Sequence, residues 1–360
     1  MKTKQILQRF GLLLFVAFLG SCEQEPLSEP AEDQANFTGK ASARIGVYKN
    51  MLDFPDVETF LNTLEELEDQ LEAYDDAFLD EWGHLDDESL DEKEDELKYD
   101  PAQPLIDFEN QFSEFSSLRK KISAEEEIWL NNEELDEKTD PDNHYIFDDE
   151  VRTVVNKFGN VKIGKDLYHF TRFGYVTVST MDVGLLEAIA VSNVDEFVDI
   201  EGVTVYGGYT GGSSSGNYND NSGTSGSDGG AECRLGFDRS RYYYPSSNRR
   251  IKGKQKLSHP SGIWGSRIKS KTVHYKKKRG KWRRRRGKIT AEIRGLSVRF
   301  DCMEPVELNK TKTRRRRSVK VKIKAPASTG YLYKTKQMQL KTVHKKVSTG
   351  SSYDHFFWEN

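Results

Sequence analysis

The residues best suited to chemistry in this sequence form two runs of cations. Lys276–Arg286 reads KKKRGKWRRRR, and a second run, Arg314–Arg317, is arginine alone. Guanidinium groups bind carboxylate, sulfate and phosphate oxygens in bidentate geometry, and lysines add point charges. Trp282 has cations on both sides, so we expect it at the surface, where it could stack on a sugar ring. The predicted polyanion-binding residues are Lys276, Lys277, Lys278, Arg279, Lys281, Trp282, Arg283, Arg284, Arg285, Arg286, Arg314, Arg315, Arg316 and Arg317.

The charge of the chain is divided between two opposed halves. Residues 233–360 hold 37 of the 54 Lys and Arg and 7 of the 58 Asp and Glu, which leaves 17 basic and 51 acidic residues for positions 1–232. The formal net charge of −4 is therefore the sum of +30 and −34. A compact domain with such an excess repels itself, so we expect an anionic compensator. That compensator is either an external polyanion or the acidic half of the same chain. Solubility and protection of exposed strand edges offer a third explanation.

The first residues predict export and lipid anchoring. A positively charged start precedes the apolar run Gly11–Gly20, which is too short to span a membrane as a helix. The following LGSC matches the bacterial lipobox, which predicts a signal peptide at residues 1–21 and acylation of Cys22. Residues 22–40 are polar and acidic, which is typical of a disordered tether. We therefore expect a bacterial outer-membrane lipoprotein, anchored in the bilayer through Cys22 and facing the periplasm or the cell surface.

Two further cysteines, Cys233 and Cys302, lie in the basic half. Thiols outside the cytoplasm can be oxidised, so we expect a disulfide between them, with two buried free thiols as the alternative. In the chain-entropy model such a bridge contributes about 4 kcal/mol to stability. The sequence has no CxxC pair and no HExxH, so it predicts no metal site of those types.

The acidic stretch Asp140–Asp149, DPDNHYIFDD, has carboxylates spaced as loop ligands might be. An EF-hand needs Gly at its sixth loop position and Glu at its twelfth. Tyr145 and Val151 stand there instead, so the match fails. We expect a turn followed by a helix capped by Asp148, and a calcium site is the alternative.

Signatures of catalysis are missing from the sequence. The 7 histidines follow no recognisable spacing, and neither GxSxG nor a P-loop occurs in the strand–helix context that its chemistry needs. We predict a protein that is not an enzyme and needs no cofactor.

An acidic helical domain is predicted for residues 41–206, after a short strand before Lys49. Apolar residues at steps of three and four predict a helix from Pro55 to Trp82 and another from Pro104 to Ile122, with a restart at Ser123. The acidic run 86–100 is interpreted as a solvated loop. A short helix follows at 151–158, then strands at 161–163, 167–170 and 175–178 and a helix at 182–190.

A Gly/Ser/Asn-rich segment at 207–232 predicts a flexible linker. Beyond it, in residues 233–360, apolar residues alternate with Lys and Arg, as in Val319–Lys324. This period of two predicts antiparallel strands with one basic face, arranged as a sandwich or a small barrel. The predicted fold class is α+β, with a mainly helical N-terminal domain that carries a small antiparallel hairpin and an all-β C-terminal domain.

Several stretches resemble a group of uncharacterised lipoproteins from Bacteroidota-type bacteria. They are SLRKKISAEEEIWLNNEELD, the run from Asp140 to Thr171 with its GxVxIGxxxYxF pattern, and later RRIKGK and KKKRGKW. The resemblance implies a helix pair, an Asp-rich turn and a strand pair, but no known activity. The acidic residues after Cys22 are similar to the signal that sends such lipoproteins to the cell surface.

These observations lead to one functional hypothesis and one alternative. The hypothesis is an envelope lipoprotein whose basic β-domain binds an acidic glycan or lipopolysaccharide. Nucleic acid ranks below these ligands because of the predicted address. The alternative is a non-catalytic interaction protein whose acidic and basic halves dock on each other or on a partner protein.

Overall fold

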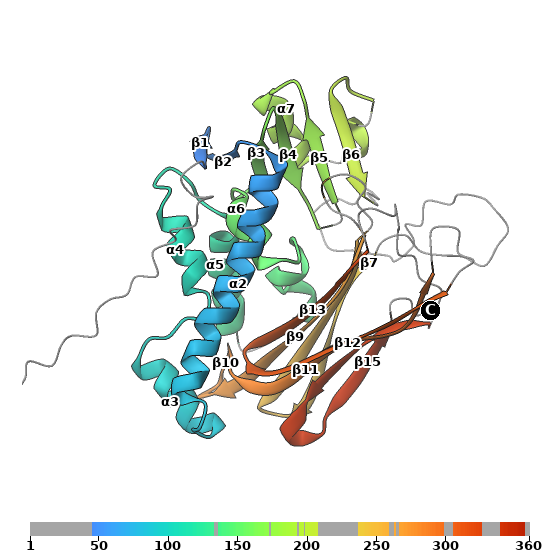
Figure 1. The fold of residues 1–360 in the computed structure, drawn as a ribbon. Helices are drawn as coiled ribbons and strands as arrows, with labels where there is room; N and C mark the ends of the chain where they lie inside the picture. Colours follow the sequence, from blue (N-terminus) through green and yellow to red (C-terminus); the bar gives the residue numbers. More distant parts are fainter. Residues whose placement is uncertain are drawn as a thin grey trace, which may run out of the picture. The chain divides into compact units, whose positions relative to one another are not determined.

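The helix α2, Val57–Trp82, is the longest element of the N-terminal half of this computed structural model (Figure 1). The structure describes residues 45–132, 136–172, 174–192, 194–197, 199–207, 237–258, 263, 266–298, 305–325 and 339–356, all within one compact unit, Gly39–Asn360. The Asp56 carboxylate accepts a hydrogen bond of 2.6 Å from the Thr59 amide and so caps the helix. The predictions for the signal peptide, Cys22, the tether, Cys233 and Cys302, and all of the linker except residue 207, fall outside the described residues.

The prediction of a loop at residues 86–100 is wrong, because α3 spans Asp87–Glu96. The Asp86 side chain accepts hydrogen bonds from the amides of Glu88 and Ser89 and starts this helix. Leu90 is fully buried, and so are the carboxylates of Asp91 and Glu94. A helix whose buried side is largely acidic has no apolar stripe, which is why the sequence did not reveal it.

The predicted second helix is divided into α4, Gln103–Asn110, and α5, Leu118–Asn131. The break lies before Leu118 and not at Ser123, because the hydroxyl of Ser117 accepts the Lys120 amide at 3.0 Å and caps α5. Two short 3-10 helices, η2 Glu137–Thr139 and η3 Pro141–Asn143, lead into α6, Asp149–Val154.

A six-stranded sheet follows the order β1-β2-β3-β4-β5-β6. Only its β2–β3 pair is parallel, since the chain returns there after the helices. The predicted strands at 161–163, 167–170 and 175–178 and the helix at 182–190 are confirmed. The helix α7 packs on this sheet around a core that includes Met51, Val176 and Leu186. The bounds are β1 Gly46–Tyr48, β2 Met51–Phe54, β3 Asn160–Ile163, β4 Asp166–Phe170, β5 Gly174–Val178, α7 Val183–Val191, η4 Val194–Phe197 and β6 Val203–Gly207.

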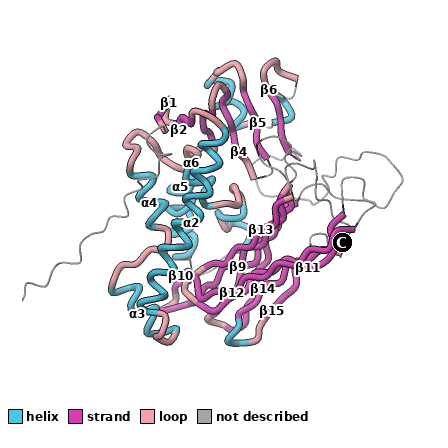
Figure 2. The backbone as a smooth tube through the Cα atoms, viewed as in Figure 1, coloured by secondary structure: helices cyan, strands magenta, loops and turns pink. Residues whose placement is uncertain are grey.

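Strands form most of the described chain after residue 237 (Figure 2). They are longer than the short strands expected from the sequence. Their bounds are β7 Phe237–Ser246, β8 Arg249–Ser258, β9 Arg267–Lys278, β10 Lys281–Arg284, β11 Gly287–Val298, β12 Pro305–Arg316, β13 Ser318–Lys324, β14 Leu340–Lys346 and β15 Ser352–Phe356; η6, Val347–Thr349, precedes the last strand.

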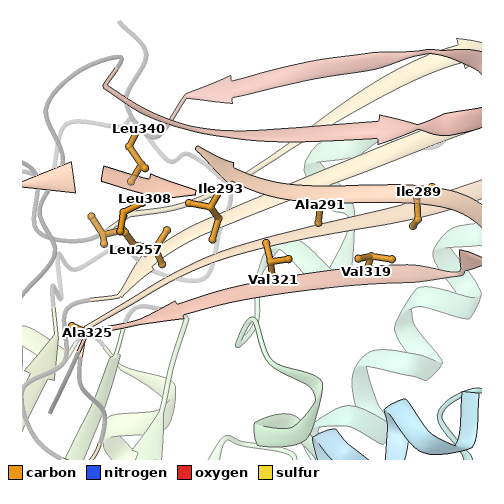
Figure 3. Packing of buried hydrophobic residues seen from close by; sticks show 10 residues of the cluster. Leu257, Ile289, Ala291, Ile293, Leu308, Val319, Val321, Ala325 and Leu340 are labelled. Atoms are coloured by element: carbon orange, nitrogen blue, oxygen red, sulfur yellow. The ribbon is translucent and has the colours of Figure 1, made fainter. Parts of the chain in front are cut away.

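These strands form two antiparallel sheets that share a core, as in a sandwich. One has the order β10-β9-β8-β7 with β13 also paired to β9, and the other has the order β12-β11-β14-β15. Apolar side chains of both sheets, such as Val321 and Ile293, meet in one buried cluster (Figure 3). The predicted α+β fold class with a β-rich C-terminal part is confirmed.

Candidate polyanion-binding site

The predicted basic block is a β-hairpin made of the end of β9 and all of β10. Lys278 pairs with Lys281, and Lys276 pairs with Arg283. The turn residues Arg279 and Gly280 have φ values of 51° and 80°. Positive φ at both central positions is the geometry of a type I′ turn, whose twist suits a two-residue hairpin. The hairpin therefore places positively charged residues directly opposite each other on its two strands.

Trp282 is 7% exposed, so the expectation that it lies at the surface is wrong. Successive side chains of a strand point to opposite faces. Trp282 and Arg284 share the face that contacts α5, whereas Lys281 and Arg283 are exposed. The Trp282 ring packs with Val273 and Tyr275. It cannot stack on a sugar in this position.

The Trp282 ring belongs to an aromatic cage around a buried cation. The Arg250 guanidinium carbon lies 4.5 to 5.1 Å from the ring centres of Trp129, Tyr242, Tyr275 and Trp282. A desolvated guanidinium over aromatic faces gains about 2 kcal/mol or more. The cage links α5 to three strands of the β-sandwich, because Trp129 is on the helix.

Most of the predicted cations contact carboxylates of the helices. Arg286 is fully buried and pairs with Asp75 and Glu94. The other distances from nitrogen to oxygen are 2.8 Å for Arg284 to Glu126, 2.9 Å for Arg285 to Asp95, 2.9 Å for Arg315 to Asp87, 2.6 Å for Arg316 to Asp76, 2.8 Å for Arg317 to Glu94 and 3.2 Å for Lys276 to Asp91. The second run, Arg314–Arg317, therefore faces α2 and α3 more than solvent, although Arg314 itself is exposed.

Two rows of lysine cross the strands β8, β9 and β13. In one row Lys254 pairs with Lys271, which pairs with Lys320; Lys256, Lys269 and Lys322 form the other row in the same manner. Like charges directly opposite each other destabilise a sheet. Here carboxylates stand above the rows: Asp142 is 3.1 Å from Lys254, Asp149 is 2.7 Å from Lys271, Glu150 is 2.8 Å from Lys320 and Glu68 is 2.6 Å from Lys322.

The acidic stretch at 140–149 provides several of these carboxylates. Asp140 and Asp142 lie 2.7 and 2.8 Å from the Lys252 ammonium, and all three side chains are fully buried. Asp148 precedes α6, but its side chain makes no capping hydrogen bond and pairs with Lys269 instead. Asp148 therefore stands at the predicted N-cap position, but its side chain does not cap the helix, because the lysine competes for the same oxygen atoms. The ammonium of Lys252 occupies the place between the carboxylates where a cation would bind.

Burial and pairing shift the titration of these groups in opposite directions. Burial alone would raise the pKa of Asp148, but Lys269 and Lys320 outweigh it and hold that pKa well below its usual value. Burial lowers the pKa of Lys254 to about 7, although Asp142 opposes this. Burial also raises the pKa of Glu126 in spite of the nearby Arg284.

One end of the hairpin remains available to a ligand. Lys278, Arg279, Lys281 and Arg283 are exposed, and Lys277 is half-buried. Within the part of the chain that the structure describes, none of these five has a carboxylate at ion-pair distance. We call these five residues the hairpin end. It is the part of the predicted site that keeps both exposure and unbalanced positive charge.

A cavity of about 250 Å³ lies between the helices and the sandwich. Side chains of both signs line it, among them Glu68, Glu126, Glu150, Arg284, Arg314 and Lys320. Most of these groups already pair with each other, so an entering ligand would have to displace existing ion pairs. The cavity therefore offers less free charge than the hairpin end.

Within the described ranges, no group of three or more His, Cys, Asp or Glu side chains is arranged to hold a metal ion. Among the helices that the structure describes, none is both long and apolar enough to cross a membrane.

Comparison with known proteins gives one distant structural match. No family model matches the chain, and no curated protein matches it. The chain is similar to a solved protein of the DUF4848 family from Bacteroides thetaiotaomicron, with 12% identity, 87% of this chain and 98% of that chain covered, and a TM-score of 0.20. This is a distant structural neighbour from a family of unknown function.

Sequence reasoning missed the carboxylates that contact the basic strands and also missed β8. The available signal was the alternation in RRIKGKQKLS, where Lys252, Lys254 and Lys256 share one face. Charged residues at every second position predict a strand whose charged face is exposed to solvent. In the structure Lys252 and Lys254 are buried against Asp142 of η3, so the alternation could have revealed the strand but not its environment.

Proposed function

We propose that this protein is a non-catalytic envelope lipoprotein whose hairpin end binds anionic polymers, namely an acidic glycan or lipopolysaccharide. The observation that carries the proposal is the exposed set of cations at Lys277–Arg283 with no carboxylate beside it among the described residues. A cluster of uncompensated positive charge attracts a negatively charged polymer over about a Debye length.

The geometry favours recognition by charge over recognition of sugar rings. Trp282 is turned inward, so the hairpin end offers ammonium and guanidinium groups but no ring from this position. Arg279 and Arg283 suit bidentate contacts with sulfate, phosphate or carboxylate groups. We therefore expect binding that depends on the density of anionic groups and weakens steeply with salt.

The test compares two variants of the full chain that lose the same charge. The first replaces Lys278, Arg279, Lys281 and Arg283 with Gln. The control replaces Lys120, Lys157, Lys165 and Lys288 with Gln, which are exposed elsewhere. Retention on heparin resin and on lipopolysaccharide-coated beads should fall for the first variant and persist for the control. Equal retention of both variants at low salt would contradict a role for the hairpin end.

A second candidate is an interaction protein in which the acidic and basic halves neutralise each other. The ion pairs that α2 and α3 make with Lys276, Arg285, Arg286 and Arg315–Arg317 favour it, because they neutralise these cations within the chain. If the halves only neutralise each other and the hairpin end binds no polyanion, the native chain will not be retained on either matrix at low salt. The same columns therefore distinguish the two candidates.

The address is part of the same proposal. Acylation of Cys22 would anchor the chain to the outer membrane, and Cys233 and Cys302 would be bridged in an oxidising compartment. Cys22→Ser should release the protein from the membrane fraction and abolish incorporation of labelled palmitate. Thiol labelling of the unfolded chain, with and without reductant, reports the bridge.

A further inference from the structure

Lys254 and Asp142 form a close pair inside the protein. The Lys254 Nζ lies 3.1 Å from Asp142 Oδ2 and donates a hydrogen bond of 2.7 Å to the main-chain carbonyl of the same residue. Both side chains are almost completely buried. The second contact fixes the amine beside the carboxyl group. Buried charges of this kind are destabilising unless they are compensated or neutralised.

Two other cations divide the oxygens of Asp142 between them. The Lys252 ammonium lies 2.8 Å from Oδ2, the oxygen nearer Lys254. The Arg152 guanidinium lies 2.7 Å from Oδ1. The Phe147 ring centre, 5.2 Å from Lys254 Nζ, places an apolar surface against the amine. A cation beside each oxygen thus withdraws electron density from the carboxyl carbon of Asp142, and the Lys254 nitrogen lies next to the same carboxyl group.

We propose that Lys254 and Asp142 join in an intramolecular amide bond, which fastens the helical half of the chain to the β-sandwich. The Lys254 nitrogen forms a bond to Asp142 Cγ, and the bond from Cγ to Oδ2 breaks. Oδ2 leaves as water with one proton from the attacking nitrogen and one from the Lys252 ammonium. Lys252 then takes up the proton that Lys254 had released before the attack. The net reaction turns one ammonium and one carboxylate into one amide and one water.

The surroundings support each role in this step. Burial lowers the pKa of Lys254 to about 7, so a large share of its amine is unprotonated near neutral pH. The pKa of Lys252 is raised well above its usual value, because Asp140 and Asp142 outweigh its burial, so it keeps a proton to give. Arg152 remains beside Oδ1 and stabilises the negative charge that develops there during the attack.

In water the equilibrium favours hydrolysis of an amide, but the fixed position of the Lys254 amine beside the Asp142 carboxyl group favours its formation. Amide formation from separate molecules in water is unfavourable, but well-oriented groups in one molecule reach effective concentrations of about 10⁵–10⁸ M. The bond also removes two charges from a buried site, which avoids part of their desolvation penalty. Asp140 continues to neutralise Lys252, and Asp149, 3.1 Å from Arg152, continues to neutralise that arginine.

Peptide mapping of the native full-length chain tests the proposal directly. The chain is unfolded, digested and analysed by mass spectrometry. We expect one branched product that contains the peptides with Asp142 and Lys254, lighter than their sum by one water. Recovery of both peptides separately at their full sequence masses would overturn the proposal. A loss of water confined to the Asp142 peptide would reveal a cyclic imide, and a bond to Lys252 or Lys269 would contradict the assignment of Lys254.

Two arginine variants provide a matched comparison. Lys254→Arg keeps a positive charge but removes the attacking amine, so the branched peptide should vanish. Lys256→Arg changes the next lysine on the same face of β8, whose Nζ donates to the main-chain carbonyl of Arg172 at 2.6 Å. This second variant should keep the branched product. Because the native chain alone decides the question, misfolding of either variant would leave the test intact.

Discussion

Arg286 gives the sharpest test of how the two halves hold together. Its guanidinium is fully buried, pairs with Asp75 and Glu94, and lies 4.7 Å from the ring centre of Phe78 and 5.2 Å from that of Tyr99. Arg286→Met keeps most of the side-chain length and removes the charge. Two carboxylates then lose a partner inside the protein.

The expected loss of unfolding free energy depends on which cations remain beside Asp75 and Glu94. Asp75 retains Arg316 at 2.8 Å, and Glu94 retains Arg317 at 2.8 Å. Removal of one partner from a buried ion pair costs about 3–5 kcal/mol when nothing replaces it. With two arginines left nearby, we expect a value near the lower limit, about 3 kcal/mol. The free energy of unfolding from urea titration of the full chain measures it.

A control and a double variant show whether the charge is the cause. Arg283→Met changes an exposed arginine of β10, three residues before Arg286, and should stay within about 0.5 kcal/mol of the native chain. Adding Glu94→Gln to Arg286→Met should recover part of the loss, because it removes one of the stranded charges. A loss below about 1 kcal/mol for Arg286→Met, or equal losses for Arg286→Met and Arg283→Met, would refute the reasoning.

Three further predictions concern buried groups of the sandwich. Burial lowers the pKa of His274 to about 4 and that of His344 to about 3, whereas an unfolded histidine titrates near 6.5. Stability present above pH 6.5 should therefore fall by about 3 kcal/mol for His274 and about 5 kcal/mol for His344 as the pH drops toward these values, and urea midpoints at a series of pH values measure it. Gly253→Ala should lower the thermal midpoint clearly, because its Cβ would overlap the Tyr353 hydroxyl and the His344 ring. Arg250→Met should change the free energy of unfolding by no more than about 1 kcal/mol, because the lost contact with the aromatic faces is offset by relief of burying guanidinium nitrogens that have no hydrogen-bond partner among the described residues. Arg250→Ala should cost about 2–4 kcal/mol through the cavity it leaves.

Periodicity predicted those elements whose buried side is apolar. The stripe of α2 and the alternation of Val319, Val321 and Ile323 both appear in the structure where the sequence placed them. The hairpin at Lys276–Arg286 was also foreseeable, because the Arg279-Gly280 pair between basic strands suits a two-residue turn. In each case a local rule and the tertiary structure agree.

The elements that the sequence missed bury charge instead of apolar surface. In α3 the buried positions include Asp91 and Glu94, and in β8 they include Lys252 and Lys254. Rules built on apolar spacing assign such residues to solvent. Their burial depends on partners far away in sequence, such as Arg286 for Glu94, and no local pattern contains that information. The inward turn of Trp282 is missed for the same reason, since the cage that receives it is assembled from distant strands and α5.

The lysine rows connect the architecture to the candidate functions. Lys254, Lys271 and Lys320 stand side by side on one sheet face and repel one another without the carboxylates of η3 and α6. The basic strands therefore need the acidic helices before they can form a stable sheet. Lysines in the middle of the sheet are paired with carboxylates in the folded protein. Only the cations at the edge, in the hairpin end, remain available to a ligand. A polyanion that competed for the central rows would have to unfold the protein, whereas one that binds Lys278 and Arg279 would leave it intact.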